Sequence, residues 1–165
     1  MRQLAVAAFT TSILIGATPC FAEGEPQQRV IAACAAYDLQ AVSMIEERGK
    51  TASASDLVGA FDRVLTARAA CRQGQGVEGL SGYAEAVGGS PSNDTMTLLK
   101  QACAAYDLQL LSYFEEQGRK TASDAQEVSD RVWAVIAARS DCGQGRFIEA
   151  LRLYDQTARR ANIDG

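Results

Sequence analysis

The chain contains no histidine among its 165 residues. This absence excludes Ser-His-Asp and Cys-His nucleophile systems, and it also excludes zinc sites with imidazole ligands. None of the usual signatures of histidine-free enzymes occurs either. We therefore expect a protein that is not an enzyme and that uses no cofactor and no metal.

A basic excess is also missing. The sequence has 16 Lys and Arg against 20 Asp and Glu, a net charge of −4, and it has no cluster of basic residues that could form a stripe. Nucleic acids and anionic membrane surfaces both require clustered positive charge. We therefore expect a protein partner and no nucleic acid.

Long apolar runs are absent apart from Leu4 to Ala17, which is too short for a membrane-spanning helix of about 20 residues. This run follows the basic Arg2 and precedes Cys20-Phe21-Ala22, which ends in a small residue. That pattern is typical of a secretory signal peptide. The sequence predicts a signal peptide over 1–22, cleavage near Ala22, no membrane span, and a periplasmic or secreted product.

The rest of the chain contains an internal repeat. The octapeptide Ala33–Gln40 (ACAAYDLQ) returns unchanged 69 residues later as Ala102–Gln109, and further matches follow downstream at a spacing of 71. Positions kept between two diverged copies indicate shared constraints. The predicted organisation is repeat 1 over 23–87, a Gly/Ser/Pro linker over 88–93, and repeat 2 over 94–165.

Each copy is predicted to form three helices, because apolar residues recur at three- and four-residue spacing and no stretch alternates like a strand. The first helices should begin near Pro26 and Asp94, and Gly49 and Gly118 should end them as left-handed caps. The other expected boundaries are capping boxes (Ser53 with Asp56, Ser123 with Gln126), helix ends at Cys71 and Cys142, and third helices after Gly74 and Gly145. The fold class is all-α, with two three-helix repeats packed with approximate two-fold symmetry.

Four cysteines remain beyond the predicted signal peptide. An even number in an exported chain favours disulfides. If the first two helices of a copy form an antiparallel hairpin, the start of one meets the end of the other. The predicted disulfides therefore lie within each copy, Cys34 with Cys71 and Cys103 with Cys142.

An acid and a base accompany each cysteine pair. Asp38 lies one turn after Cys34, and Arg68 lies about one turn before Cys71, so both fall on otherwise apolar helix faces at the same level of the hairpin. A bidentate fork makes such a pair tolerable in the interior. We predict two buried structural ion pairs, Asp38 with Arg68 and Asp107 with Arg139.

Aromatic residues supply the candidate binding contacts. Trp133 is the only tryptophan, and it lies opposite the cysteine on the wheel of its helix, whose counterpart in repeat 1 should bury Leu57, Phe61, Val64 and Leu65. Burial is the expected state of this large side chain, although exposure as a binding anchor is the alternative. The candidate contacts are Trp133, Tyr83, Tyr154 and the exposed sides of Tyr37 and Tyr106.

The last two helices of repeat 2 resemble a tetratricopeptide hairpin. The resemblance rests on the spacing of small and aromatic residues, partly repeated in the first copy by Ala67, Gly74 and Tyr83: Ala138, Gly145, Phe147, Ala150 and Tyr154. It covers about 25 residues and does not include the first helix, so we interpret it as shared hairpin geometry. Kinship would imply peptide binding on a concave helical surface.

These observations favour one function and leave two alternatives open. The leading hypothesis is a non-catalytic exported interaction module that binds another envelope or secreted protein. The first alternative is a small-ligand carrier with a cavity at the repeat junction near Asp38, Arg68, Asp107 and Arg139. The second is a tetratricopeptide-like peptide-binding protein.

Overall fold

The chain folds as six helices. The computed structural model describes residues 24–120 and 125–163, and within these ranges it contains no strand. The all-α prediction with six helices is confirmed. The predicted signal peptide over 1–22 and the capping residue Ser123 lie outside the described residues. The helices are α1 (Glu25–Arg48), α2 (Ala54–Arg72), α3 (Gly76–Val87), α4 (Asn93–Lys120), α5 (Ala125–Gly143) and α6 (Phe147–Arg160).

Local sequence explains several helix ends. Ser53 caps α2 by accepting a hydrogen bond from the backbone N–H of Asp56 at 3.2 Å. Gly88 ends α3 with a φ of 61°, a left-handed conformation that glycine adopts without a steric penalty. Gly49 ends α1 as predicted, but the left-handed conformation expected there is wrong, and so is the helix end expected at Gly118. Gly49 follows α1 with a right-handed φ of −56°, and Gly118 lies inside α4, which continues to Lys120.

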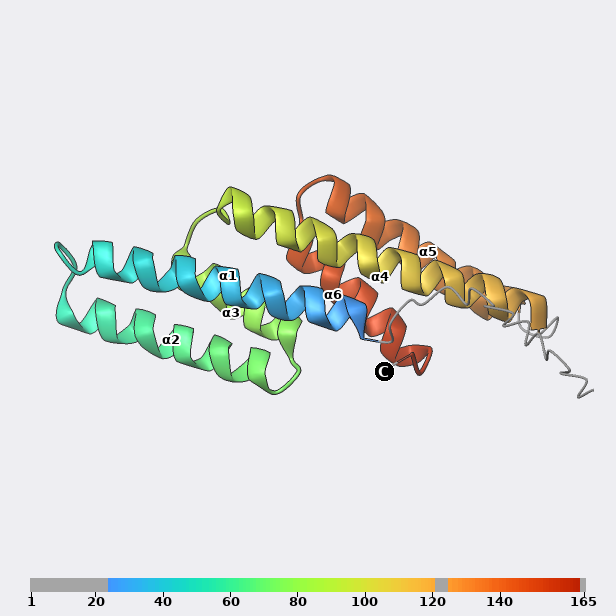
Figure 1. The fold of residues 1–165 in the computed structure, drawn as a ribbon, viewed down its shortest axis with the longest axis horizontal. Helices are drawn as coiled ribbons and strands as arrows, with labels where there is room; N and C mark the ends of the chain where they lie inside the picture. The colour runs from blue at the N-terminus through green and yellow to red at the C-terminus, as the bar shows by residue number, and fades with distance from the viewer. Residues whose placement is uncertain (1–23, 121–124, 164–165) are drawn as a thin grey trace, which may run out of the picture.

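The long helices α1 and α4 lie side by side in the middle of the molecule (Figure 1). They run antiparallel, because Arg29 near the start of α1 bonds Gln101 while Gln40 further along α1 bonds Thr95 near the start of α4. The outer helices α2 and α5 pack on α1 and α4 respectively. The short helices α3 and α6 contact each other and complete the bundle.

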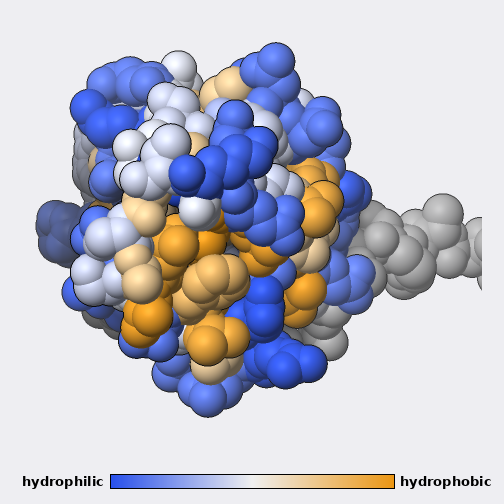
Figure 2. Space-filling view, turned by 90° about the vertical axis from the view of Figure 1, so that its left-hand side faces the viewer, coloured by the Kyte–Doolittle hydropathy of each residue, from blue (hydrophilic) through white to orange (hydrophobic). Residues whose placement is uncertain are grey.

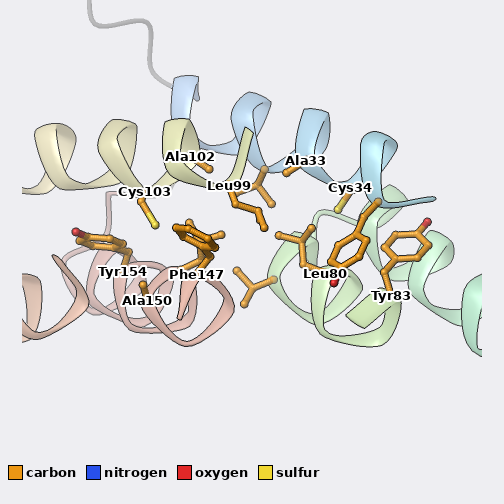
Figure 3. Close-up of a cluster of buried hydrophobic side chains, with 14 of the residues drawn as sticks. Ala33, Cys34, Leu80, Tyr83, Leu99, Ala102, Cys103, Phe147, Ala150 and Tyr154 are labelled. Atoms are coloured by element: carbon orange, nitrogen blue, oxygen red, sulfur yellow. The ribbon is translucent and has the colours of Figure 1, made fainter. Parts of the chain in front are cut away.

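One hydrophobic core runs through all six helices. Figure 3 shows Leu80, Leu99 and Phe147 in the centre of this core, with Tyr83 at one end and Tyr154 at the other. Small residues such as Ala33 and Ala102 are fully buried and allow close approach of the long helices. The core therefore joins the first three helices to the last three.

None of the described helices combines the length and the apolar character needed to cross a bilayer.

Candidate functional site

One disulfide connects the two helices of each hairpin. Cys34 in α1 is joined to Cys71 in α2, with Cα atoms 6.4 Å apart. Cys103 in α4 is joined to Cys142 in α5, with Cα atoms 6.6 Å apart. Both links connect the early part of a long helix to the end of the next helix, which is the arrangement expected for an antiparallel hairpin. Two intramolecular disulfides fit an oxidising compartment.

The structure brings each acid to its predicted base. Nε and Nη2 of Arg68 donate to the two carboxylate oxygens of Asp38, each at 3.0 Å. The matching bonds from Arg139 to Asp107 are 3.1 and 2.9 Å long. The predicted burial is wrong, because the Arg68 and Arg139 side chains are 40% and 52% exposed. The bidentate ion pair lies at the edge of the hairpin, because each aspartate is about 40° from its cysteine on the helical wheel, on the side toward solvent.

A tyrosine completes each ion pair. The hydroxyl of Tyr83 in α3 donates to Oδ1 of Asp38 at 2.8 Å, and the hydroxyl of Tyr154 in α6 donates to Oδ1 of Asp107 at 3.0 Å. We call Asp38, Arg68 and Tyr83 the first cluster, and Asp107, Arg139 and Tyr154 the second cluster. Sequence analysis missed this role. The signal was present, because both tyrosines recur in register with the acid and the base.

The four candidate tyrosine contacts are not on the surface. Tyr83 and Tyr154 are each 1% exposed, and Tyr37 and Tyr106 are 1% and 2% exposed. Tyr37 packs against Tyr83 with ring centroids 6.1 Å apart, and Tyr106 stacks on Tyr154 at 6.0 Å. The prediction that these tyrosines contact a partner is therefore wrong. Each ring faces the core, where it buries a large apolar area.

The electrostatics of the clusters favour a structural role. Burial first, and then the adjacent carboxylate, raise the pKa of Tyr83 and of Tyr154 far above the ordinary tyrosine value. Hydrogen bonds to Asp38 raise the pKa of Arg68. Asp38 accepts three hydrogen bonds, two from Arg68 and one from Tyr83. Its carboxylate is therefore poorly placed to act as a general base. No group of three or more Cys, Asp or Glu side chains in the described ranges could hold a metal ion.

Trp133 is 65% exposed, so the expectation of burial is wrong. It lies on the face of α5 opposite Cys142, and α4 and α6 pack on the other side of this helix. The prediction of which α2 side chains are buried is also partly wrong. Val64 is buried, but Phe61 and Leu65 are 43% and 54% exposed because α2 turns its Ala60, Val64 and Ala67 side inward.

Eight large apolar side chains are exposed in the described structure, and they divide between the two hairpins. The first strip comprises those of α1 and α2: Ile31, Leu39, Val58, Phe61 and Leu65. The second strip comprises those of α4 and α5: Leu108, Trp133 and Ile136. Figure 2 shows apolar side chains gathered into a patch with a hydrophilic border on the end of the molecule where α1 joins α2.

The proposed ligand cavity between the four charged residues does not form. The two clusters lie at opposite ends of the core, as the positions of Tyr83 and Tyr154 show (Figure 3). The junction instead carries a groove of about 620 Å³ between α1 and α4, which we call the α1–α4 groove. Its lining contains none of the four charged residues: Glu25, Pro26, Arg29, Gln101, Ala104, Ala105, Leu108, Gln109, Ser112, Tyr113, Glu116 and Ile163.

Comparisons with protein-family models, with curated proteins and with solved structures found no significant match.

Proposed function

We propose that this chain is an exported, non-catalytic helical interaction module that binds another envelope or secreted protein through its two apolar strips. In this proposal the secretory signal is removed near Ala22 and the product works in the periplasm or outside the cell. The two halves are duplicated three-helix units related by approximate two-fold symmetry. The clusters and disulfides hold each hairpin in shape and take no part in chemistry.

The main support is that exposed apolar side chains recur at equivalent positions of the two halves. Leu39 and Leu108 occupy the same place in the repeated octapeptide, and their exposed fractions are 70% and 47%. Leu65 and Ile136 each lie one turn before the paired arginine of their helix, with exposed fractions of 54% and 40%. Scattered apolar exposure is ordinary, but repeated exposure at matched sites indicates a contact surface.

The rigid frame around each strip also supports binding. Leu39 directly follows Asp38, and Leu65 lies one turn from Arg68, so the first strip flanks an ion pair that connects α1 to α2. The Cys34–Cys71 disulfide crosslinks the same two helices. A surface held in place before binding loses little conformational entropy on association. Two strips on one chain would also allow bivalent attachment.

The test is to place charges on the strips. Leu39→Asp with Leu65→Asp changes the first strip, and Leu108→Asp with Ile136→Asp changes the second. Gln156→Asp on the exposed face of α6 is the matched control. The partner is identified by cross-linking in a periplasmic extract, and its affinity for each purified variant is then measured by calorimetry. We expect each double variant to weaken binding at least tenfold and the control to leave it unchanged. Unchanged binding in both double variants would reject the proposal.

A small-ligand carrier is the second candidate, and the volume of the α1–α4 groove favours it. About 620 Å³ falls within the range of ordinary ligand pockets. A carrier purified from its own compartment should retain its ligand in a native mass spectrum. A spectrum containing only the mass of the polypeptide would argue against this function.

A further inference from the structure

Gln40 binds an extended segment of backbone. Its Oε1 accepts a hydrogen bond from the N–H of Ser92 at 2.9 Å, and its Nε2 donates to the C=O of Ser90 at 3.2 Å. Residues 90–92 have no regular secondary structure. One side-chain amide thus pairs with the C=O of one residue and the N–H of the second residue after it. The middle residue, Pro91, has no N–H to satisfy.

Gln109 occupies the same position in the second half. It ends the octapeptide that is identical in the two copies, so Gln40 and Gln109 follow the same residues at the same helical register. Because α1 and α4 pack antiparallel, the two glutamines also have equivalent neighbours on the opposite helix. Gln40 bonds Thr95 near the start of α4, whereas Gln109 lines the α1–α4 groove together with Pro26 near the start of α1. Pro26 and Thr95 are 69 residues apart, which is also the spacing between the two copies of the octapeptide.

The surroundings of the two glutamines differ in one respect. The amide of Gln40 is covered by the linker that leads into α4, but the side-chain amide of Gln109 makes no hydrogen bond to any residue in 24–120 or 125–163. It lies half-buried in the wall of the α1–α4 groove. The wall of the groove includes the small or apolar side chains of Ala104, Ala105 and Leu108, and charged side chains such as Arg29 and Glu116 also line it. Among the residues that the structure describes, the second half thus has no segment on Gln109 like the one that covers Gln40 in the first half.

We propose that the α1–α4 groove binds an extended segment of a partner polypeptide, and that Gln109 pairs with the C=O of one residue of this segment and the N–H of the second residue after it. The segment has small side chains around a central proline, as in Ser90-Pro91-Ser92. This chemistry follows from the bonds of Gln40. The groove shares only Leu108 with the second strip and nothing with the first, so this site goes beyond the proposed function.

The test uses the disulfide-bonded exported chain and a synthetic peptide. The probe is the capped, fluorescently labelled sequence of residues 87–94, VGGSPSND, and binding is followed by fluorescence anisotropy. We expect saturable binding that Gln109→Ala weakens about tenfold, the loss expected for two neutral hydrogen bonds. Gln73→Ala, an exposed glutamine at the end of α2, is the matched control and should bind as the unmodified chain does.

Two further variants make the result specific. Ser112→Trp should abolish binding by filling the groove, and a probe with an N-methyl group on the residue equivalent to Ser92 should fail because it lacks the donor for Gln109. The strip variants Leu39→Asp and Leu65→Asp should leave peptide binding intact, which separates this site from the proposed function. Circular dichroism verifies that each variant is folded.

Several outcomes would overturn the proposal. One is absence of binding, and another is equal affinity for the unmodified chain and Gln109→Ala. A co-purifying small molecule that blocks the peptide would assign the groove to a carrier instead. If a chain beginning at Gly24 bound the peptide and longer forms did not, the chain's own preceding residues would be the occupant rather than a partner.

Discussion

Tyr83 donates its hydroxyl proton to the carboxylate of Asp38 across a distance of 2.8 Å. The same carboxylate accepts two hydrogen bonds from Arg68, so a single acid connects α1, α2 and α3. Its three bonds differ in environment. The arginine is 40% exposed, whereas the tyrosine is 1% exposed. Removing Asp38 should therefore lower the free energy of unfolding more than removing Arg68 does.

Alanine substitutions in the first cluster test this order of energetic costs. Arg68→Ala should lower the free energy of unfolding by about 1 kcal/mol, because water can replace an exposed guanidinium. Asp38→Ala should cost about 2–3 kcal/mol, because the buried Tyr83 hydroxyl loses its acceptor. Urea denaturation measures both values. If Arg68→Ala were the more damaging change, the ion pair would be energetically buried despite its exposure.

Stability should fall at alkaline pH. The pKa of Tyr83 and Tyr154 is higher in the folded chain than in the unfolded chain, first because of burial. A raised pKa stabilises the fold fully below the unfolded value of about 10, and this contribution is lost as the pH rises above it. Unfolding measured between about pH 8 and pH 12 should show the decline. Tyr83→Phe with Tyr154→Phe should be less stable at neutral pH and should flatten the pH dependence, so an unaltered slope would contradict this cause.

The disulfides should stabilise the fold independently of any redox role. Replacing Cys34 and Cys71 by alanine removes a link between residues 37 apart in sequence and should cost about 4 kcal/mol. Thermal unfolding of the double variant measures this loss. A non-reducing peptide map should connect Cys34 to Cys71 and Cys103 to Cys142, and a link between the two halves would contradict the hairpin arrangement.

Gly79 permits the closest approach of α3 to α2. A Cβ at this position would overlap Sγ of Cys71 and lie 2.9 Å from the C=O of Ala67. Gly79→Ala should therefore destabilise the protein by about 1–3 kcal/mol through overpacking. The equivalent residue in the second half, Ala150, is fully buried and already carries a methyl group.

The reverse substitution is the matched control for Gly79. Ala150→Gly should destabilise by about 1 kcal/mol, because it loses a buried methyl and adds backbone freedom within α6. Both unfolding energies are measured in urea. A stabilising Gly79→Ala would mean that α3 moves easily away from α2 beside the Cys34–Cys71 disulfide.

Repetition was the most reliable guide to the candidate site. Asp38 and Arg68 could be paired in advance because each recurs beside a cysteine, and helix periodicity set them at one level of the hairpin. Tyr83 also recurs, yet its hydrogen bond was missed because no periodic rule specifies how a third helix crosses the first two. Gln40 and Gln109 were overlooked for the same reason, although both belong to the repeated octapeptide.

Exposure was predicted less well than secondary structure. Trp133 was expected in the core and is exposed, whereas Tyr37 and Tyr106 were expected at the surface and are buried. A helical wheel shows which residues share a face, but not how much of that face a neighbour covers. In α2, the inward face centres on Ala60, Val64 and Ala67, so Phe61 and Leu65 fall outside it.

Helix formation, the cysteine partners and the acid–base pairing follow from the sequence, because they depend on interactions between residues close along a helix or at one level of a hairpin. The antiparallel contact of α1 with α4, the burial of the tyrosines and the open groove beside Gln109 depend on the tertiary structure. They arise where helices distant in sequence meet, and small side chains such as Ala33 and Ala102 let these helices approach closely. The linker over residues 90–92 covers Gln40 of the first octapeptide because it leads into α4, which packs against α1.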